Sequence, residues 1–158
     1  MTDTAQTRTA PHVCARHRSI KYINRVEAIT PRQLRGIEIA ASTDDGIPAV
    51  HLVCWRNSVA LDMSGLASME CESAVENGVV VHTATLTATL PGLAGPVPPA
   101  CCFLMTAVDG SRWLMGTDMR PYPRVSYTRN LPQSPGDACV SQLTATWVST
   151  VGIMRVIG

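Results

Sequence analysis

The sequence predicts a mainly β protein, an antiparallel β-sandwich or barrel with extended loops and an N-terminal arm. From residue 19 onward, short runs rich in β-forming residues alternate with Gly, Pro, Asn and Asp turn signals, which is the pattern of successive strands. No segment carries apolar residues at the i, i+3, i+4, i+7 spacing of an amphipathic helix. With 158 residues and 46% hydrophobic content, the chain has the size of one domain with one core.

Residues 1–18 differ from the rest of the chain. They are rich in Thr and Arg, contain Pro11, and show neither helical nor strand periodicity. Such a composition buries too little apolar surface to offset the ordering of its backbone. We therefore expect residues 1–18 to be an arm that a neighbouring subunit orders, followed by a single β domain over residues 19–158. In such an arm, Arg8, Arg16 and Arg18 would pair with carboxylates of the neighbour.

Two β-hairpins are predicted from the turn residues between alternating runs. Arg56-Asn57 separates AVHLVCW from SVALDMS, and Asp109-Gly110 separates CCFLMTAV from SRWLMGT. The Asp-Gly pair favours a type I′ turn, because glycine takes a positive φ without a Cβ penalty. We expect each pair of runs to form two antiparallel strands.

Residues 78–90 predict one long strand. His82 and the apolar residues at every second position up to Leu90 share one face, and four threonines share the other. At about 3.3 Å per residue such a strand reaches about 43 Å, so we expect it to project or bend. The segments PGLAGPVPP and NLPQSPGD predict extended, fairly stiff loops, because proline interrupts both helices and central strands.

Charge and cysteine content restrict the partners. A net charge of +1 is too small to hold a polyanion or an acidic membrane surface, so neither a specific nucleic acid nor a membrane is expected as a partner. No apolar run has membrane-spanning length, and the N-terminus lacks the apolar region of a secretory signal. We therefore expect synthesis in a reducing cytoplasm, with the six cysteines free and no disulfide.

No group of residues predicts a catalytic, cofactor-binding or metal site. His12, Cys14 and His17 come nearest to a metal cluster, but they lack a fourth ligand. Cys101 and Cys102 would point to opposite faces of a strand. A nucleophile with a base can be assembled only on paper, because the chain has no GxSxG motif. The residues for it would be His51 or His82 with Asp62 or Asp44. We therefore expect no enzymatic activity, no cofactor and no small-molecule substrate.

The segment WLMGTDMRPYPRVSY, residues 113–127, contains three of the seven aromatic residues together with two arginines. Trp113 is expected in the core, whereas a turn stiffened by prolines leaves Arg120, Tyr122 and Arg124 outside. Near-neutral charge does not favour stacking on single-stranded bases. Because Tyr and Arg concentrate at protein–protein contacts, these three residues are the predicted interface of the domain.

The order of several segments over residues 62–149 resembles a known group of proteins. SGLASMECESAVENGVVVHTATLTATLP is followed by FLMTAVDGSRWLMGTDMRPYPRVSYT and by a closing LTATWVS. This succession resembles small β-rich proteins encoded among the structural genes of tailed phages and prophages of anaerobic gut bacteria. The resemblance implies a virion structural protein of the tail or neck, made in the host cytoplasm. Its subunits would form a ring homo-oligomer that contacts other virion proteins.

Two other functions remain open from the sequence. A cytoplasmic small-ligand-binding β-barrel would need an apolar pocket lined by residues such as Trp55, Trp113 and Trp147. A hydrolase of unrecognised type would need a catalytic set that the sequence does not reveal. Self-association distinguishes a ring subunit from a monomeric ligand carrier.

Overall fold

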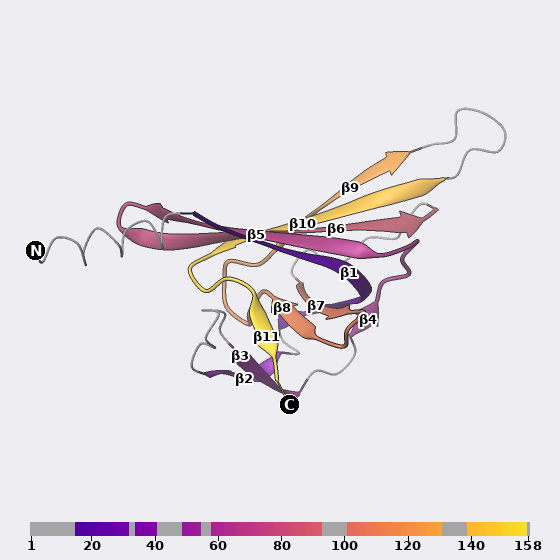
Figure 1. Ribbon diagram of the computed structural model, residues 1–158. Coiled ribbons are helices and arrows are strands. Elements are labelled where there is room, and N and C mark those ends of the chain that lie inside the picture. Colours follow the sequence, from indigo (N-terminus) through magenta and orange to yellow (C-terminus); the bar gives the residue numbers. More distant parts are fainter. Residues whose placement is uncertain are drawn as a thin grey trace, which may run out of the picture.

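The chain is built from β-strands, which confirms the mainly β prediction (Figure 1). The structure, a computed structural model, describes residues 15–31, 34–40, 49–54, 58–92, 101–130 and 139–157. The strands are β1 (Ala15–Ile29), β2 (Arg35–Ala40), β3 (Ala49–Cys54), β4 (Val59–Ala60), β5 (Ala67–Glu76), β6 (Val79–Pro91), β7 (Cys102–Ala107), β8 (Arg112–Met115), β9 (Arg124–Asn130), β10 (Val140–Ser149) and β11 (Met154–Val156).

The strands form one open sheet rather than a closed barrel or two separate sheets. Their order is β2-β3-β11-β8-β7-β1-β5-β6-β10-β9, and β4 pairs with β1 beside this path. The neighbours are antiparallel except for β11 and β3, which are parallel. β2 and β9 therefore lie at the two ends of the order. Each carries an edge that no described strand pairs with.

β1 bends and joins the two halves of this sheet. It pairs with β5 as far as Ile23 and with β7 from Ile23 to Ile29. The register shifts within this region, and Tyr22 has a positive φ of 65°. Such a β-bulge bends a strand and increases its twist. Figure 1 shows β1 curving from the long upper strands (β5, β6, β10, β9) toward the lower half (β7, β8, β11, β3, β2).

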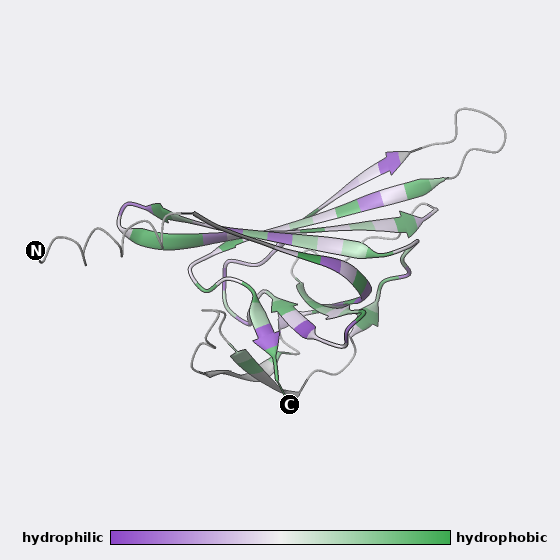
Figure 2. Cartoon of the chain, viewed as in Figure 1, coloured by the Kyte–Doolittle hydropathy of each residue, from purple (hydrophilic) through white to green (hydrophobic). Residues whose placement is uncertain are grey.

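The apolar faces of the two halves contribute to one core. Leu86 and Trp147 of the upper half belong to the same buried cluster as Phe103 and Leu114 of the lower half. Figure 2 shows hydrophobic and hydrophilic residues alternating along the long strands, as expected where one sheet face is buried. Trp147 is 2% exposed. Trp113, which we expected inside, is only half-buried and packs against this cluster, so the expectation for Trp113 needs correction.

The hairpin at Asp109-Gly110 is confirmed, but its turn differs from the predicted one. β7 pairs with β8, and the N–H of Ala107 donates to the carbonyl of Ser111 at 2.9 Å. Gly110 has a φ of 90°, whereas Asp109 is not among the described residues with positive φ. A type I′ turn needs positive φ at both central residues. The connection is therefore a three-residue loop with glycine in the left-handed position.

The hairpin expected at Arg56-Asn57 does not form. β3 lies between β2 and β11, while β4 pairs with β1 at Glu27 and Ala28. β3 pairs with β2 along one edge and with β11 at Ala49 and Val50 on the other, whereas β4 has its partner in β1. Residues 55–57 themselves lie outside the described part of the chain.

The long strand is confirmed as β6. Its 13 residues pair with β5 on one side and β10 on the other. Ala84, Leu86, Ala88 and Leu90 are buried, and the alternating threonines are partly exposed. The end of the β5–β6 hairpin extends past the lower half in Figure 1. The strand therefore projects, as its length suggested.

The first strand begins inside the segment that we expected to be an arm. β1 begins at Ala15, and residues 15–18 pair with Ala74 to Cys71 of β5 in the same chain. The backbone of Arg16 and Arg18 thus belongs to the sheet, because it continues the edge pairing of β5. Arg8 lies outside the described residues.

Candidate functional site

The segment between β8 and β9, residues 117–123, forms a turn that we call the proline turn. Trp147 donates its indole N–H to the carbonyl of Pro121 at 3.0 Å. The thiol of Cys102 donates to the carbonyl of Thr117 at 3.2 Å. Pro123 is buried. Three contacts with the interior therefore hold the turn in place.

Gly116 allows the close packing at the start of this turn. Its φ is 108°, a conformation that favours glycine. A Cβ at this position would lie 2.8 Å from the sulfur of Cys102 and 3.1 Å from Cδ of Pro123. Any larger residue would push β7 and the proline turn apart. The hydroxyl of Thr117 adds a local bond, because it accepts the N–H of Met119 at 3.1 Å.

The proline turn displays residues that add little to the core. Met119 is 71% exposed, and Arg120 and Pro121 are also exposed. Tyr122 is half-buried. Met, Arg and Tyr are the residue types enriched at protein–protein contacts. Buried residues hold the turn on one side, and apolar and cationic side chains are exposed on the other. This arrangement is suited to binding a partner.

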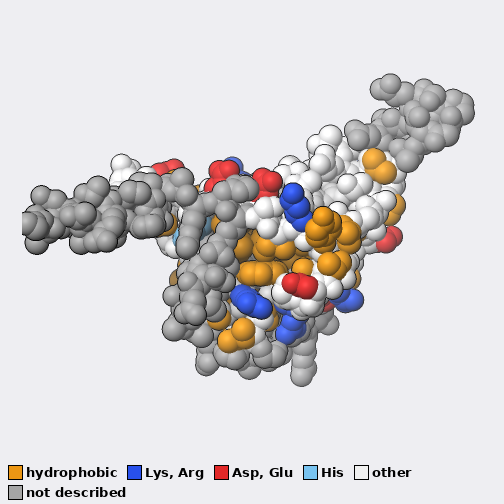
Figure 3. All heavy atoms as spheres, viewed as in Figure 1, with side chains coloured by type: hydrophobic (Ala, Val, Ile, Leu, Met, Phe, Trp, Pro, Cys, Tyr) orange, Lys and Arg blue, Asp and Glu red, His pale blue; other side chains and the backbone are white. Residues whose placement is uncertain are grey.

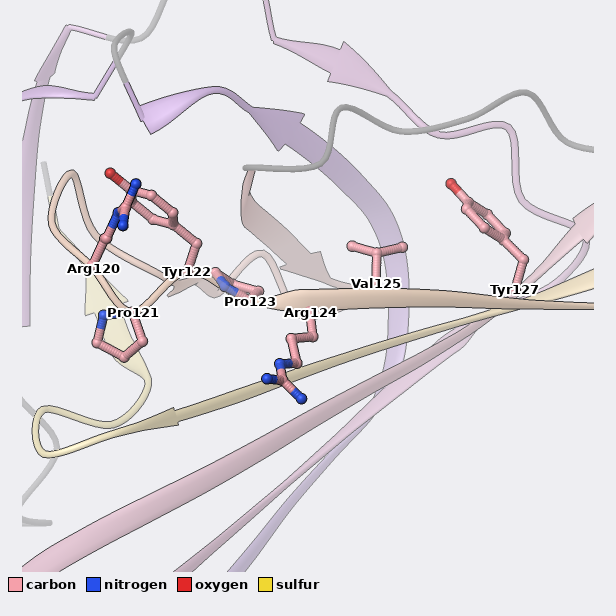
Figure 4. A pocket seen from close by; sticks show the side chains of 7 residues that line it. All are labelled: Arg120, Pro121, Tyr122, Pro123, Arg124, Val125 and Tyr127. Carbon is pink, nitrogen blue, oxygen red and sulfur yellow. The ribbon is translucent and has the colours of Figure 1, made fainter.

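A groove of about 600 Å³ lies beside the turn and continues along β9. We call it the tyrosine groove; its lining residues are Arg120, Pro121, Tyr122, Pro123, Arg124, Val125 and Tyr127. Val125 and Tyr127 lie opposite Ala145 and Leu143 of β10, both of them core residues. Figure 4 shows Arg120, Tyr122, Val125 and Tyr127 rising from the same side of the chain. The groove is therefore aromatic and aliphatic, with a cation at one end.

Arg124 points to the other side of β9. It lies opposite Thr146, on the polar outer face of the upper half, and Figure 4 shows its side chain directed away from Tyr122 and Tyr127. Of the six residues predicted as an interface, the structure thus brings Arg120 and Tyr122 together at the mouth of the groove. Arg124 lines only the outer rim. Arg16 and Arg18 lie in β1, opposite Ser73 and Cys71 in register, away from this site.

Figure 3 shows hydrophobic side chains exposed in a recess on the face viewed, with Lys or Arg side chains near its rim. A second hollow of about 540 Å³ lies at the β7–β8 turn. It is lined by Asp109, Gly110, Ser111, Arg112, Arg155, Val156 and Ile157. Neither this hollow nor the tyrosine groove has Trp113 or Trp147 in its lining, two of the tryptophans that a ligand-binding barrel would use. The indole N–H of Trp113 instead donates to Oγ of Ser111. The guanidinium carbon of Arg155 lies 5.9 Å from the centroid of the Trp113 ring.

One polar pair on the core-facing side of the upper half was not predicted. Oγ of Ser73 and Nδ1 of His82 are 2.6 Å apart, and burial lowers the pKa of His82. Gly152 packs against the imidazole, since a Cβ there would lie 3.0 Å from its Cγ. The N–H of Gly152 donates to Oγ of Ser149, which lies opposite His82 in β10. His82 and Ser149 thus hold the β10–β11 connection at Gly152 against the upper half.

Residue types suited to catalysis or metal binding are otherwise dispersed. Within the described ranges, no three His, Cys, Asp or Glu side chains lie close enough to hold a metal ion. Asp44, His12 and Cys14 fall outside those ranges, and Asp62 is exposed. Burial raises the pKa of Cys101 to about 11 and that of Cys102 to about 12, which disfavours their thiolates.

Comparisons of the chain with protein families, curated proteins and solved structures found no match. Among the described residues, no helix has the length and apolar character needed to cross a membrane.

Proposed function

We propose that this chain is a non-enzymatic structural subunit that assembles with copies of itself, as a virion building block of a phage tail or neck ring does. The observation that carries the proposal is the proline turn. Buried Trp147 and Cys102 hold it, yet it exposes Met119 and Arg120 beside the edge strand β9. A turn held this firmly loses little further entropy when a partner binds.

The open sheet edges support the same proposal. An edge strand presents unpaired backbone N–H and C=O groups, which natural proteins cover, shorten or use for association. β9 pairs with β10 on one side and ends the strand order. In a ring, each subunit offers such a surface to its neighbour, and the contact repeats around the closed assembly.

The β5–β6 hairpin offers a further contact surface. Val75 is 40% exposed and Val79 is 51% exposed near its tip, which lies away from the core. Figure 2 shows green strand ends on this hairpin beside a purple turn. Apolar residues on a projecting ribbon favour burial against another subunit or another virion protein.

Self-association of the full chain tests this function. We expect light scattering during size-exclusion chromatography to show a mass larger than the monomer, increasing with protein concentration. Tyr122→Ala should shift the chain toward the monomer and leave the free energy of unfolding within about 0.5–1 kcal/mol of the original, because Tyr122 is not a core residue. Tyr22→Ala is the matched control, since Tyr22 is 60% exposed in β1 and lies outside the groove.

Two results would contradict the proposal. The first is a monomeric mass at every protein concentration. The second is a Tyr122→Ala protein that self-associates as strongly as the Tyr22→Ala protein and the original chain. That result would show that the proline turn is not part of the contact.

A further inference from the structure

The tyrosine groove has the chemistry of a proline-binding surface. Tyr122 and Tyr127 stand at its two sides, Pro123 and Val125 lie between them, and Arg120 is at one end (Figure 4). Aromatic grooves of this kind bind proline-rich segments in the polyproline II conformation, because tyrosine rings pack on pyrrolidine rings. The bound segment is already extended and loses little entropy. An acidic residue beside the prolines would pair with Arg120.

The chain contains a segment with this pattern. In NLPQSPGDA, residues 130–138, Pro132 and Pro135 are three residues apart, and Asp137 follows two residues later. In polyproline II, which has three residues per turn, the two prolines lie on the same side about 9 Å apart. Asp137 then lies about 6 Å beyond Pro135. Bound along the groove, Pro135 would lie toward Tyr122, Pro132 toward Val125 and Tyr127, and the Asp137 carboxylate toward Arg120.

The segment cannot occupy the groove of its own chain in this way. Asp137 is two residues from Cys139, so it stays within about 7 Å of it. Cys139 adjoins Val140, which pairs with Asn130 at the far end of β9. Arg120 precedes the opposite end of β9, whose seven residues span about 20 Å. Only the segment of another copy can place its carboxylate beside Arg120.

We propose that the tyrosine groove of one copy binds the proline-rich segment 130–138 of a second copy. The inference rests on the proposed function, because both require contact between copies, and it names the two surfaces that meet. The contact is heterologous, because the segment of one copy meets a different surface, the groove, of the other copy. Repeated in one direction it closes a ring, and exchanged reciprocally it forms a pair.

Peptide binding tests the contact directly. The receptor is the full chain with Pro132→Ala and Pro135→Ala, which keeps the groove and removes the competing segment. A fluorescently labelled NLPQSPGDA peptide should bind it saturably in polarisation measurements. The peptide with both prolines replaced by Ala should bind about tenfold more weakly or worse. Replacing Asp137 by Asn should weaken binding about two- to fivefold, because an exposed ion pair contributes little.

Changes in the receptor provide the matching test. Tyr122→Ala, added to the receptor, should weaken peptide binding about tenfold or more, and Tyr22→Ala should leave it unchanged. The peptide comparisons do not depend on how well any groove variant folds. Equal binding of the proline and alanine peptides would overturn the proposal. Tighter binding of PGLAGPVPP, residues 91–99, would also overturn it, since that segment lacks an acidic residue.

Mixing two defective proteins separates this contact from self-association in general. The Tyr122→Ala chain keeps its segment, and the Pro132→Ala, Pro135→Ala chain keeps its groove. Each alone should associate poorly, whereas their mixture should form mixed pairs in native mass spectrometry. If both variants still assemble as the original chain does, this inference is wrong and the proposed function stands. If the original chain never assembles although the peptide binds, the proposed function is wrong and the groove remains a peptide-binding site.

Discussion

Replacing Trp147 by Phe should weaken both the fold and the association of copies, although Trp147 is inaccessible to a partner. Trp147 is 2% exposed, and its indole N–H donates to the carbonyl of Pro121 at 3.0 Å. Phe keeps most of the buried apolar surface but removes the donor. Loss of the hydrogen bond costs about 0.5–1.5 kcal/mol, and the smaller ring leaves a void. We expect a total loss of about 1–3 kcal/mol in the free energy of unfolding.

The same change should release the proline turn. Without the hydrogen bond to Pro121, the turn that displays Tyr122 is ordered less firmly. Association should then be weaker, because it must also order the turn. Urea denaturation gives the free energy of unfolding, and light scattering gives the association. Val148→Ala is the control, because Val148 is adjacent in sequence, 49% exposed and on the outer face. A Trp147→Phe protein that loses stability but associates like the original chain would refute the link between this bond and the turn.

Three other changes test individual contacts. Gly116→Ala should lower the free energy of unfolding by about 3 kcal/mol or more, since its Cβ would lie 2.8 Å from the Cys102 sulfur. Gly65→Ala, in open space, should lower it by about 1 kcal/mol. Equal losses in urea denaturation would contradict this. Because burial lowers the pKa of His82, the folded chain binds that proton less readily than the unfolded chain. Stability should therefore be full above about pH 6.5 and fall below it, and His82→Gln should flatten that fall in melts at several pH values. In the folded chain, a thiol reagent followed by mass spectrometry should modify Cys139 well before Cys102, whose pKa is about 12; equal rates would contradict the burial argument.

The parts of the fold that depend on local pattern could be predicted from the sequence. β6 follows from the two-residue alternation of threonine with apolar residues, and the Asp109-Gly110 connection follows from glycine's tolerance of positive φ. The pairing of β3 could not be predicted in this way. Its neighbours come from residues 35–40 and 154–156, and their competition for its edges is invisible in the Arg56-Asn57 dipeptide.

The candidate site was predicted in part. Composition indicated Arg120 and Tyr122, because Arg and Tyr favour contacts. The direction of Arg124 could also have been derived, since it alternates with Val125 on β9 and must face the other side. The hydrogen bond that supports the turn could not have been predicted from the sequence, because Trp147 donates to a residue 26 positions away. The Ser73–His82 pair likewise depends on the register of β5 against β6.

The proline turn lies at the surface, yet buried residues of the core hold it in place. Ordering the backbone costs about 1–2 kcal/mol per residue, and the exposed side chains of Met119 and Arg120 return little of that within the monomer. A buried indole donor and a glycine packed against Cys102 fix the backbone of this loop. These contacts supply the ordering free energy during folding, before any partner arrives. In the contact that we propose between copies, a groove whose tyrosine is already in position would lose less entropy on association.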